Sequence, residues 1–99
     1  VSEPHLDIER LKLLNAATET PLVLHGGSGV PDEQLRAAFS NGINKLNIAT
    51  HYNQIIYSAV SDVIEHQRSA TPRISDCMKA AKPMVQDYIR HLIRIGSGK

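Results

Sequence analysis

Several features that would assign the sequence to a special class of protein are missing or scarce. Its 99 residues include one cysteine, Cys77, so no internal disulfide can form, and tryptophan is absent. No apolar run reaches the length of about 18 residues that a membrane-spanning helix needs. The first residues also lack the charged segment and apolar core of a signal peptide. We therefore expect a cytoplasmic protein that is neither secreted nor inserted in a membrane.

A surplus of charge of one sign is missing too. The chain has 11 Lys and Arg against 10 Asp and Glu, which gives a formal net charge of +1. Its basic residues are scattered, whereas nucleic-acid-binding surfaces gather them on one face, so no nucleic-acid partner is expected. Hydrophobic residues make up 41% and charged residues 21% of the chain, a balance typical of a globular protein rather than a disordered one.

What the sequence does contain is a series of amphipathic helix patterns. Apolar residues recur at helical spacing in four segments, residues 6–17, 31–41, 55–64 and 78–93. Asp7 is placed to cap the first segment, and Pro31, followed by two acidic residues, suits the first turn of the second. Pro83 lies within the fourth segment, where it predicts a kink or a late start of the regular helix.

Two short apolar runs between these segments predict β-strands, Pro21–Leu24 and Ile43–Ala49, the first of them buried on both faces. Thr50 is expected to close the second strand. Strands that alternate with helices through short connections form right-handed crossovers and a parallel sheet. We therefore expect the two strands to be neighbours, with His25 and Thr50 at the same, carboxyl end.

Two strands cannot complete a sheet and its core by themselves. A pair of apolar strands leaves edges and faces exposed, and a (β/α)8 barrel needs about 250 residues. The expected fold class is therefore α/β, with residues 1–99 forming part of a barrel domain or depending on other polypeptide to complete it. Within that part, we predict that Leu22–Leu24 pairs in parallel with Leu46–Ile48.

A histidine and a glycine-rich loop follow the first predicted strand. His25 would lie at the carboxyl end of the strand, where α/β barrels place functional side chains. Gly26, Gly27 and Gly29 let a ligand approach backbone N–H groups, and Ser28 adds a hydroxyl. A loop of this composition before a helix is suited to bind phosphate. The same residues are equally compatible with a tight turn and a structural histidine.

Polar residues also lie within and after the second predicted strand. Asn47 is an amide in an apolar strand, which costs free energy unless the amide is hydrogen-bonded. It can orient a polar ligand, or it can bond to neighbouring backbone. Thr50 follows at the strand mouth, where the last two βα loops of many barrels bind phosphate. His51 could add positive charge there when protonated, whereas His91 is expected to be a surface residue.

The segment Pro21–Glu33, with the sequence PLVLHGGSGVPDE, is followed beyond a helix by Asn41–Thr50, NGINKLNIAT. In this order the two segments closely resemble class II fructose- and tagatose-bisphosphate aldolases, and the resemblance extends from Leu6 to Gly96. It implies that the chain is the C-terminal portion of a (β/α)8 TIM barrel, comprising the last two βα units and a C-terminal helical extension. The implied activity is that of a zinc-dependent aldehyde-lyase of carbohydrate metabolism and glycolysis.

The resemblance implies roles for individual residues. His25 would be one of three histidines that hold the catalytic Zn2+, and Asn47, as a catalytic residue, would contact the enediolate part of the substrate. Arg73 would reach the distal phosphate in a neighbouring subunit of a homo-oligomer, although Thr71 replaces the aspartate that the family usually has nearby. Substrate phosphates would be bound, near a monovalent cation such as Na+ or K+, by Gly26, Gly27, Ser28, Asn47, Thr50 and Arg73.

The family's other two zinc histidines and its aspartate acid/base would lie outside this chain, so we expect the 99-residue chain alone to be inactive. The implied reaction is reversible aldol cleavage of fructose 1,6-bisphosphate or tagatose 1,6-bisphosphate to dihydroxyacetone phosphate and glyceraldehyde 3-phosphate. The sequence does not select between these epimers. Two alternatives stay open: a diverged aldolase that acts on another phosphorylated ketose, and a non-catalytic, partner-dependent segment used for phosphate binding or assembly.

Overall fold

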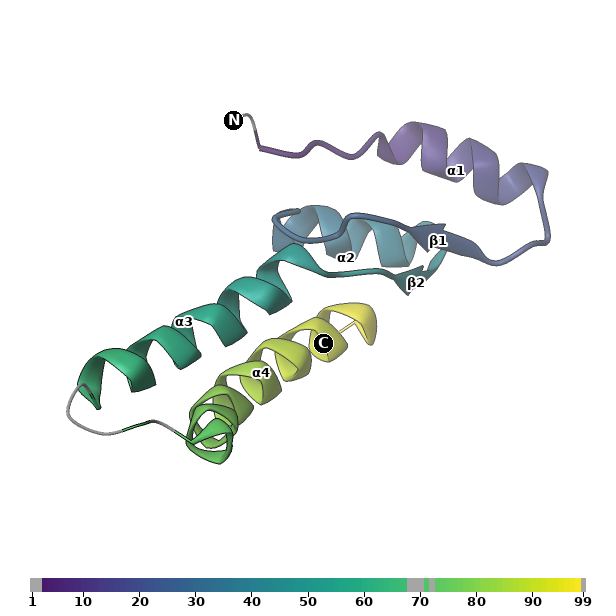
Figure 1. Ribbon diagram of the computed structural model, residues 1–99. Helices are drawn as coiled ribbons and strands as arrows, with labels where there is room; N and C mark the ends of the chain where they lie inside the picture. Colours follow the sequence, from purple (N-terminus) through teal and green to yellow (C-terminus); the bar gives the residue numbers. More distant parts are fainter. Residues whose placement is uncertain (1–2, 68–70, 72, 99) are drawn as a thin grey trace.

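A computed structural model describes residues 3–67, 71 and 73–98 and contains the expected alternation of helices and strands (Figure 1). The order along the chain is α1 (Ile8–Ala17), β1 (Leu22–Leu24), α2 (Asp32–Ser40), β2 (Ile43–Leu46), α3 (Thr50–His66) and α4 (Ile74–Gly96). Each element overlaps a segment whose apolar pattern predicted it, and α3 and α4 extend beyond the predicted segments 55–64 and 78–93. The segment between α3 and α4, residues 67–73, lies partly outside the described residues.

The first two helices begin where their capping residues place them. The side chain of Asp7 accepts a hydrogen bond of 3.0 Å from the backbone N–H of Arg10, which satisfies one of the free donors in the first turn of α1. Helix α2 begins directly after Pro31 and has two acidic residues in its first turn. It ends at Ser40, and the Asn41 side chain donates a 2.7 Å hydrogen bond to the carbonyl of Ala37.

Strands β1 and β2 pair in parallel, as predicted, but the predicted partner of β1, Leu46–Ile48, was wrong: Leu22 lies opposite Ile43 and Leu24 opposite Leu46. The predicted end of the second strand was wrong, because β2 ends at Leu46 instead of Ala49. Its partner β1 ends at Leu24, so the residues after Leu46 have no straight strand beside them. Thr50, predicted to close the strand, is instead the first residue of α3.

The sheet of two strands has one face covered within the described residues. Helix α2 packs on β2, and the small core consists of buried Val30, Leu35 and Ile95. Apolar side chains that pack around this core are Leu6, Leu24, Phe39, Leu46 and Leu92. Val23, which was expected to be buried on both faces of the sheet, is 41% exposed because no described segment covers its side of β1.

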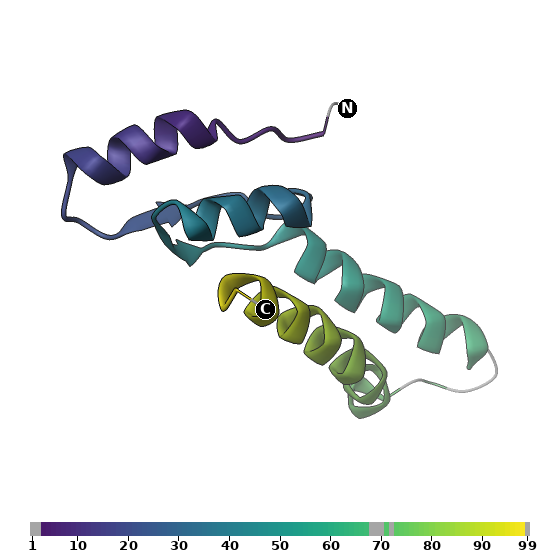
Figure 2. The same ribbon diagram turned by 180° about the vertical axis from the view of Figure 1, so that it is seen from behind.

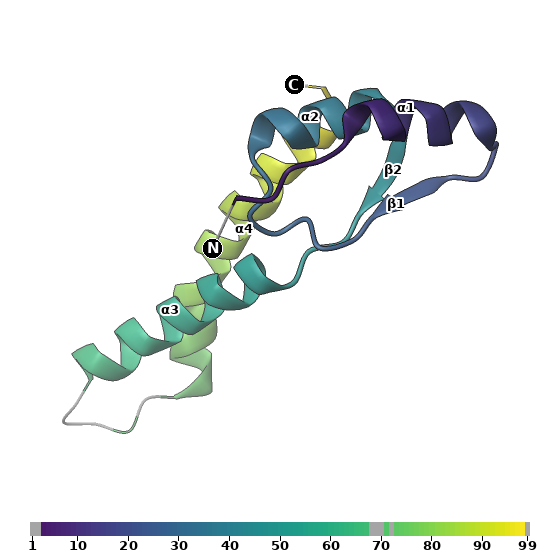
Figure 3. The same ribbon diagram turned by 90° about the horizontal axis from the view of Figure 1, so that it is seen from above.

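Helices α3 and α4 lie side by side and run in opposite directions (Figures 1 and 3). Helix α4 continues through Pro83 without a break in its assignment. Its axis nevertheless changes direction between its green start and its yellow end, which is the effect that a proline inside a helix produces. None of the helices in residues 3–67, 71 and 73–98 is long and apolar enough to span a membrane.

The molecule is elongated, with α1 and α3 at opposite ends (Figure 2). Its dimensions are 60 × 28 × 21 Å and its radius of gyration is 17.5 Å, whereas a compact domain of this length has a radius of about 13 Å. Large apolar side chains are exposed on several elements, among them Leu13, Tyr57, Ile74 and Ile93. A surface of this kind is typical of a piece that packs against further protein.

We therefore predict that the 99-residue chain alone does not unfold cooperatively, because its small core cannot offset the entropy of ordering so extended a chain. Thermal scans followed by far-ultraviolet circular dichroism should give a gradual loss of helix. The whole protein containing the chain serves as the control and should show a transition. A single sharp transition in the chain alone would contradict this prediction.

Candidate functional site

The carboxyl ends of β1 and β2 lie at the same edge of the sheet (Figure 3). The residues predicted to be functional, apart from Arg73, follow these two strand ends. His25 directly follows β1, and Asn47 directly follows β2. Two backbone hydrogen bonds continue the pairing past the strand ends, from the N–H of Asn47 to the carbonyl of Leu24 and from the N–H of Gly27 to the carbonyl of Asn47, both at 2.9 Å. The two loops are therefore held together by backbone as well as by side chains.

The side chains of His25 and Asn47 are in direct contact. Nδ2 of Asn47 lies 3.0 Å from Nδ1 of His25, so the amide bonds to an imidazole rather than to backbone. His25 is exposed and Asn47 is half-buried. This contact leaves the second ring nitrogen of His25 free, among the described residues, of any hydrogen bond in the structure.

The glycines of the loop are required for two different reasons. Gly26 and Gly29 have φ angles of 66° and 80°, in the left-handed region that residues with a Cβ rarely adopt. Gly27 has an ordinary φ, but a Cβ at this position would overlap the side chain of Leu46 on β2. The close approach of Gly27 to β2 lets the loop pair with the backbone of Asn47. These two requirements are those of a tight turn between β1 and α2.

Ser28 caps a helix that begins in the other loop. Its Oγ accepts hydrogen bonds from the backbone N–H groups of Ala49, at 3.3 Å, and of His51, at 3.2 Å. Ala49 is the N-cap of α3 and has no polar side chain of its own, so Ser28 supplies the missing acceptor. Thr50, the first residue of α3, is exposed beside this contact. The positive end of the α3 dipole therefore faces the glycine loop, which favours an anion there.

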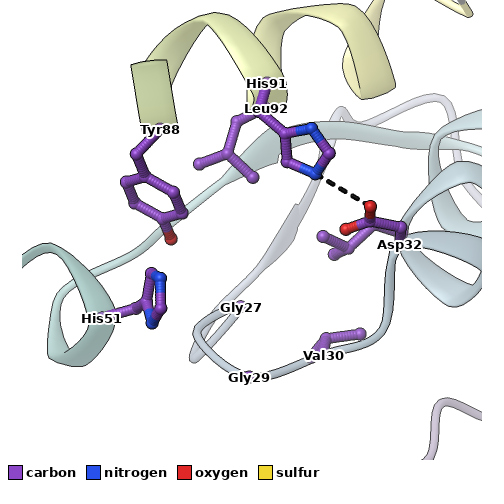
Figure 4. Close-up of a pocket in the computed structure, with 9 residues that line it drawn as sticks. Gly27, Gly29, Val30, Asp32, His51, Tyr88, His91 and Leu92 are labelled. Atoms are coloured by element: carbon purple, nitrogen blue, oxygen red, sulfur yellow. Dashed lines mark ion pairs between the residues drawn. The ribbon is translucent and has the colours of Figure 1, made fainter. Parts of the chain in front are cut away.

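Helix α4 adds residues that the sequence analysis did not identify as part of the site (Figure 4). The ring of Tyr88 lies against the ring of His51, with centroids 4.8 Å apart and a tilt of 57°. His91, expected to be an ordinary surface residue, places Nε2 2.8 Å from Oδ2 of Asp32, the first residue of α2. These residues, with Gly27 and others, line a cavity of about 250 Å³.

The sequence contained a weak signal for Tyr88 alone, since it lies on the apolar side of the last helix pattern and carries a hydroxyl. Its partial burial raises the pKa of the phenol, and a hydrogen bond with the Ser28 side chain lowers this pKa by a smaller amount. The neutral phenol is therefore the favoured form in the folded protein. Figure 4 shows the Tyr88 hydroxyl directed from α4 into the cavity.

Arg73 is not brought to this cluster. It precedes α4 at the end of α3 opposite Ser28, and its side chain is exposed. A helix of the length of α3 spans about 25 Å, so within one chain Arg73 cannot join the other predicted phosphate-binding residues.

The described residues include one possible zinc ligand but not a complete metal site. Among the described residues, no three His, Cys, Asp or Glu side chains lie close enough together to hold a metal ion. The exposed His25 imidazole is a suitable zinc donor, but catalytic zinc sites use three protein ligands. The residues present therefore fit one position of a zinc site and not a complete one.

Comparisons with known proteins match these residues to one family. The family model described as "Fructose-bisphosphate aldolase class-II" matches residues 1–97. The D-tagatose-1,6-bisphosphate aldolase subunit GatY of Klebsiella oxytoca is 34% identical over 97 residues, which is 95% of this chain and 33% of that protein. The 6-phospho-5-dehydro-2-deoxy-D-gluconate aldolase of Halalkalibacterium halodurans is 32% identical over 93 residues, 87% of this chain and 32% of that protein.

A solved structure gives the same result for the fold. The X-ray crystal structure of the YdjI aldolase from Escherichia coli K12 superposes with a TM-score of 0.73 and 32% identity, over 98% of this chain and 37% of that one. The two parallel strands and four helices thus match part of an aldolase TIM barrel. The chain spans about a third of the length of the curated relatives it matches.

The raised pKa of Tyr88 leads to a testable pH dependence in the whole protein. The folded-state pKa lies above the ordinary value of 10.0, so the stability that the neutral phenol contributes is complete below pH 10.0 and is lost as the pH rises through the raised pKa. The difference between tyrosinate absorbance titrations of the wild type and Tyr88→Phe should show this late ionisation. Ser28→Ala should move it to still higher pH, and a shift to lower pH would contradict the assignment.

Proposed function

The chain belongs to the class II fructose-bisphosphate aldolase family, and from this premise we propose that it supplies part of the active site of a zinc-dependent aldolase. The proposed reaction is the reversible cleavage of fructose 1,6-bisphosphate or tagatose 1,6-bisphosphate to dihydroxyacetone phosphate and glyceraldehyde 3-phosphate. One observation carries the proposal. His25, Ser28 and Asn47 converge at the carboxyl ends of two parallel strands, against the start of α3.

In this proposal His25 holds zinc together with two histidines that lie outside these 99 residues. The aspartate that serves as acid/base also lies outside them. Zinc, when bound, acts as a Lewis acid that stabilises the negative charge developing on the ketose carbonyl. Asn47 has two tasks. It would hold the His25 ring for zinc at Nε2 with its amide turned so that Oδ1 accepts from Nδ1–H, across the 3.0 Å contact, and its N–H groups would bond to the part of the substrate that gains negative charge.

The substrate phosphate is proposed to lie between the glycine loop and the start of α3, near a monovalent cation, Na+ or K+. Gly26 and Gly27 are proposed to border this space, with the Gly27 N–H already donating to the carbonyl of Asn47, and Thr50 adds a hydroxyl at the first position of α3. Ser28 would donate its one hydroxyl proton to a phosphate oxygen in place of Tyr88, because its two acceptor positions are already used by N–H groups. Anchoring of this kind orients the reacting atoms.

Two further parts of the proposal concern regions beyond this cluster. Residues 1–99 are proposed to form the last two βα units of the barrel with its C-terminal helical extension, in agreement with the partial match to a barrel structure. The exposed position of Arg73, remote from Ser28 in its own chain, suits a role at the distal phosphate of a neighbouring subunit in a homo-oligomer. Arg forms the paired hydrogen bonds that phosphate favours.

A second candidate is an aldolase that acts on another phosphorylated ketose. The relative from Halalkalibacterium halodurans is named for a different phosphorylated sugar acid derivative, and its identity to this chain is similar to that of the tagatose-bisphosphate relative. Residues that bind one phosphate would serve both substrates. A panel of phosphorylated ketoses, assayed with the whole protein, distinguishes the two candidates by the ratio of their kcat/KM values.

We predict that metal binding and phosphate binding separate in the whole protein. His25→Ala should lower zinc content and kcat together, since it removes a metal ligand. Thr50→Ala should leave zinc in place and raise KM with less change in kcat, lowering kcat/KM about ten- to a hundredfold, as loss of a hydrogen bond to a charged group does. His5→Ala, at an exposed histidine, is the matched control. Full zinc occupancy with normal kcat in the His25 variant would refute the metal role.

A separate prediction concerns Arg73. Arg73→Ala should raise KM for ketose bisphosphates and have little effect on a ketose monophosphate that lacks the distal phosphate. Arg90→Ala, which removes an exposed arginine of α4 paired with Asp87, is the control. Steady-state kinetics with both substrates measure the difference. Equal losses for the two substrates would argue against a contact with the distal phosphate.

A further inference from the structure

Asp32 places a negative charge beside the glycine loop, residues 25–29. It is the first residue of α2, where a carboxylate suits the positive end of the helix dipole. The same residue lines the cavity of about 250 Å³ that Gly27 and Gly29 border (Figure 4). Its charge therefore favours the start of α2 but opposes the binding of a phosphate dianion at the loop.

Helix α4 supplies a partner for this charge. Nε2 of His91 lies 2.8 Å from Oδ2 of Asp32, which is the distance of a charge-assisted hydrogen bond. Leu92 and Ile95, on the same helix, pack with Val30 at the end of the loop, so α4 is fixed beside the start of α2. The pair of Asp32 and protonated His91 has no net charge, whereas the pair with neutral His91 keeps one negative charge.

The pair is close enough to the loop for its charge to affect an anion there. A cavity of about 250 Å³ corresponds to a sphere roughly 8 Å across, which is similar to the Debye length of about 8 Å at physiological ionic strength. Salt therefore only partly screens a charge on one side of the cavity from an anion on the other. The side chains of His91 and Asp32 are 49% and 46% exposed, so we expect a severalfold change in affinity rather than complete loss.

Other charges near the pair have to be separated from it. The charged or titratable groups on the neighbouring turns of α2 and α4, and at the cavity edge of α3, are Glu33, Arg36, Asp87, Tyr88, Arg90, Arg94 and His51. Of these, Asp87 and Arg90 form an ion pair with each other. His51 is the other histidine that lines the cavity, and histidine is the side chain that ordinarily changes charge between about pH 5 and 8.

We propose that His91 sets the affinity of the glycine loop for phosphate by neutralising Asp32. Phosphate then binds most tightly when His91 is protonated, and binding weakens as the pH rises and His91 loses its proton. His91 does not contact the phosphate in this proposal, because it acts through the charge of Asp32. The inference rests on the phosphate-binding role proposed above for the loop.

The test measures the inhibition constant of inorganic phosphate in the whole protein between about pH 6 and about pH 8.5. Phosphate and His51 titrate in both proteins of a comparison, so the ratio of variant to wild type at each pH is the quantity examined. His91→Gln can still donate to Asp32 but carries no charge. Its inhibition constant should be about two- to fivefold above that of the wild type at about pH 6 and nearly equal at about pH 8.5. A ratio that does not change with pH overturns the proposal.

Two further variants show whether charge is the cause. Asp32→Asn removes the negative charge, so its inhibition constant at about pH 8.5 should lie about two- to fivefold below that of the wild type. The double variant of Asp32→Asn with His91→Gln has no charge in the pair and should bind phosphate at about pH 6 as the wild type does. A defect that persists in the double variant would assign the effect to the contact between the helices and overturn the proposal. An unchanged constant in Asp32→Asn also overturns it, even if the His91 variant fails to fold.

Two controls separate this inference from the proposed function. His66→Gln, at an exposed histidine of α3, should match the wild type at every pH. Thr50→Ala keeps both members of the pair and should raise the inhibition constant at every pH if the loop holds phosphate. An effect of Thr50→Ala together with a ratio for His91→Gln that is independent of pH overturns the inference alone. No effect of either Thr50→Ala or Ser28→Ala overturns the phosphate site and the inference with it.

Discussion

The parallel pairing of β1 with β2, continued by backbone hydrogen bonds past the strand ends, is the constraint on which the rest of the site depends. Because the strands run in the same direction, the residues that follow them meet at one edge. The bonds from Asn47 to Leu24 and from Gly27 to Asn47 then fix the two loops at that edge. Without this pairing the His25 imidazole and the Asn47 amide, from distant positions in the sequence, would not lie 3.0 Å apart.

The second level of organisation is a helix cap that one loop supplies to the helix following the other loop. Helix α3 starts after Ala49, which cannot cap it, and the acceptor comes from Ser28 in the other loop. The Ser28 cap therefore fixes the positive end of the α3 dipole beside the glycine loop. Tyr88 and His91 then contact His51 and Asp32 at the starts of α3 and α2, so that α4, a helix outside the strand–helix units, packs beside the site.

Local sequence patterns predicted the element order, the parallel pairing and the glycine loop because these depend on neighbouring residues. The pattern failed at the end of β2, since Asn47 still bonds to the backbone of Leu24 and Gly27 but the chain then leads into α3 instead of continuing as a strand to Ala49. It also failed for the burial of Val23, because burial depends on what covers a strand and not on the strand itself. The importance of Tyr88 and His91 was missed for the same kind of reason, since both act through residues far away in the chain.

The sequence by itself determined that a histidine, a glycine loop and an amide would follow two neighbouring parallel strands, and its resemblance to class II aldolases agrees with the family match. Strand direction and glycine content are local properties, so a linear pattern is sufficient to predict them. Only the tertiary structure decided that Ser28 caps α3, that Asn47 bonds to His25, and that Tyr88 of α4 packs on His51. These contacts arise from the packing of segments distant in sequence, for which no local pattern exists.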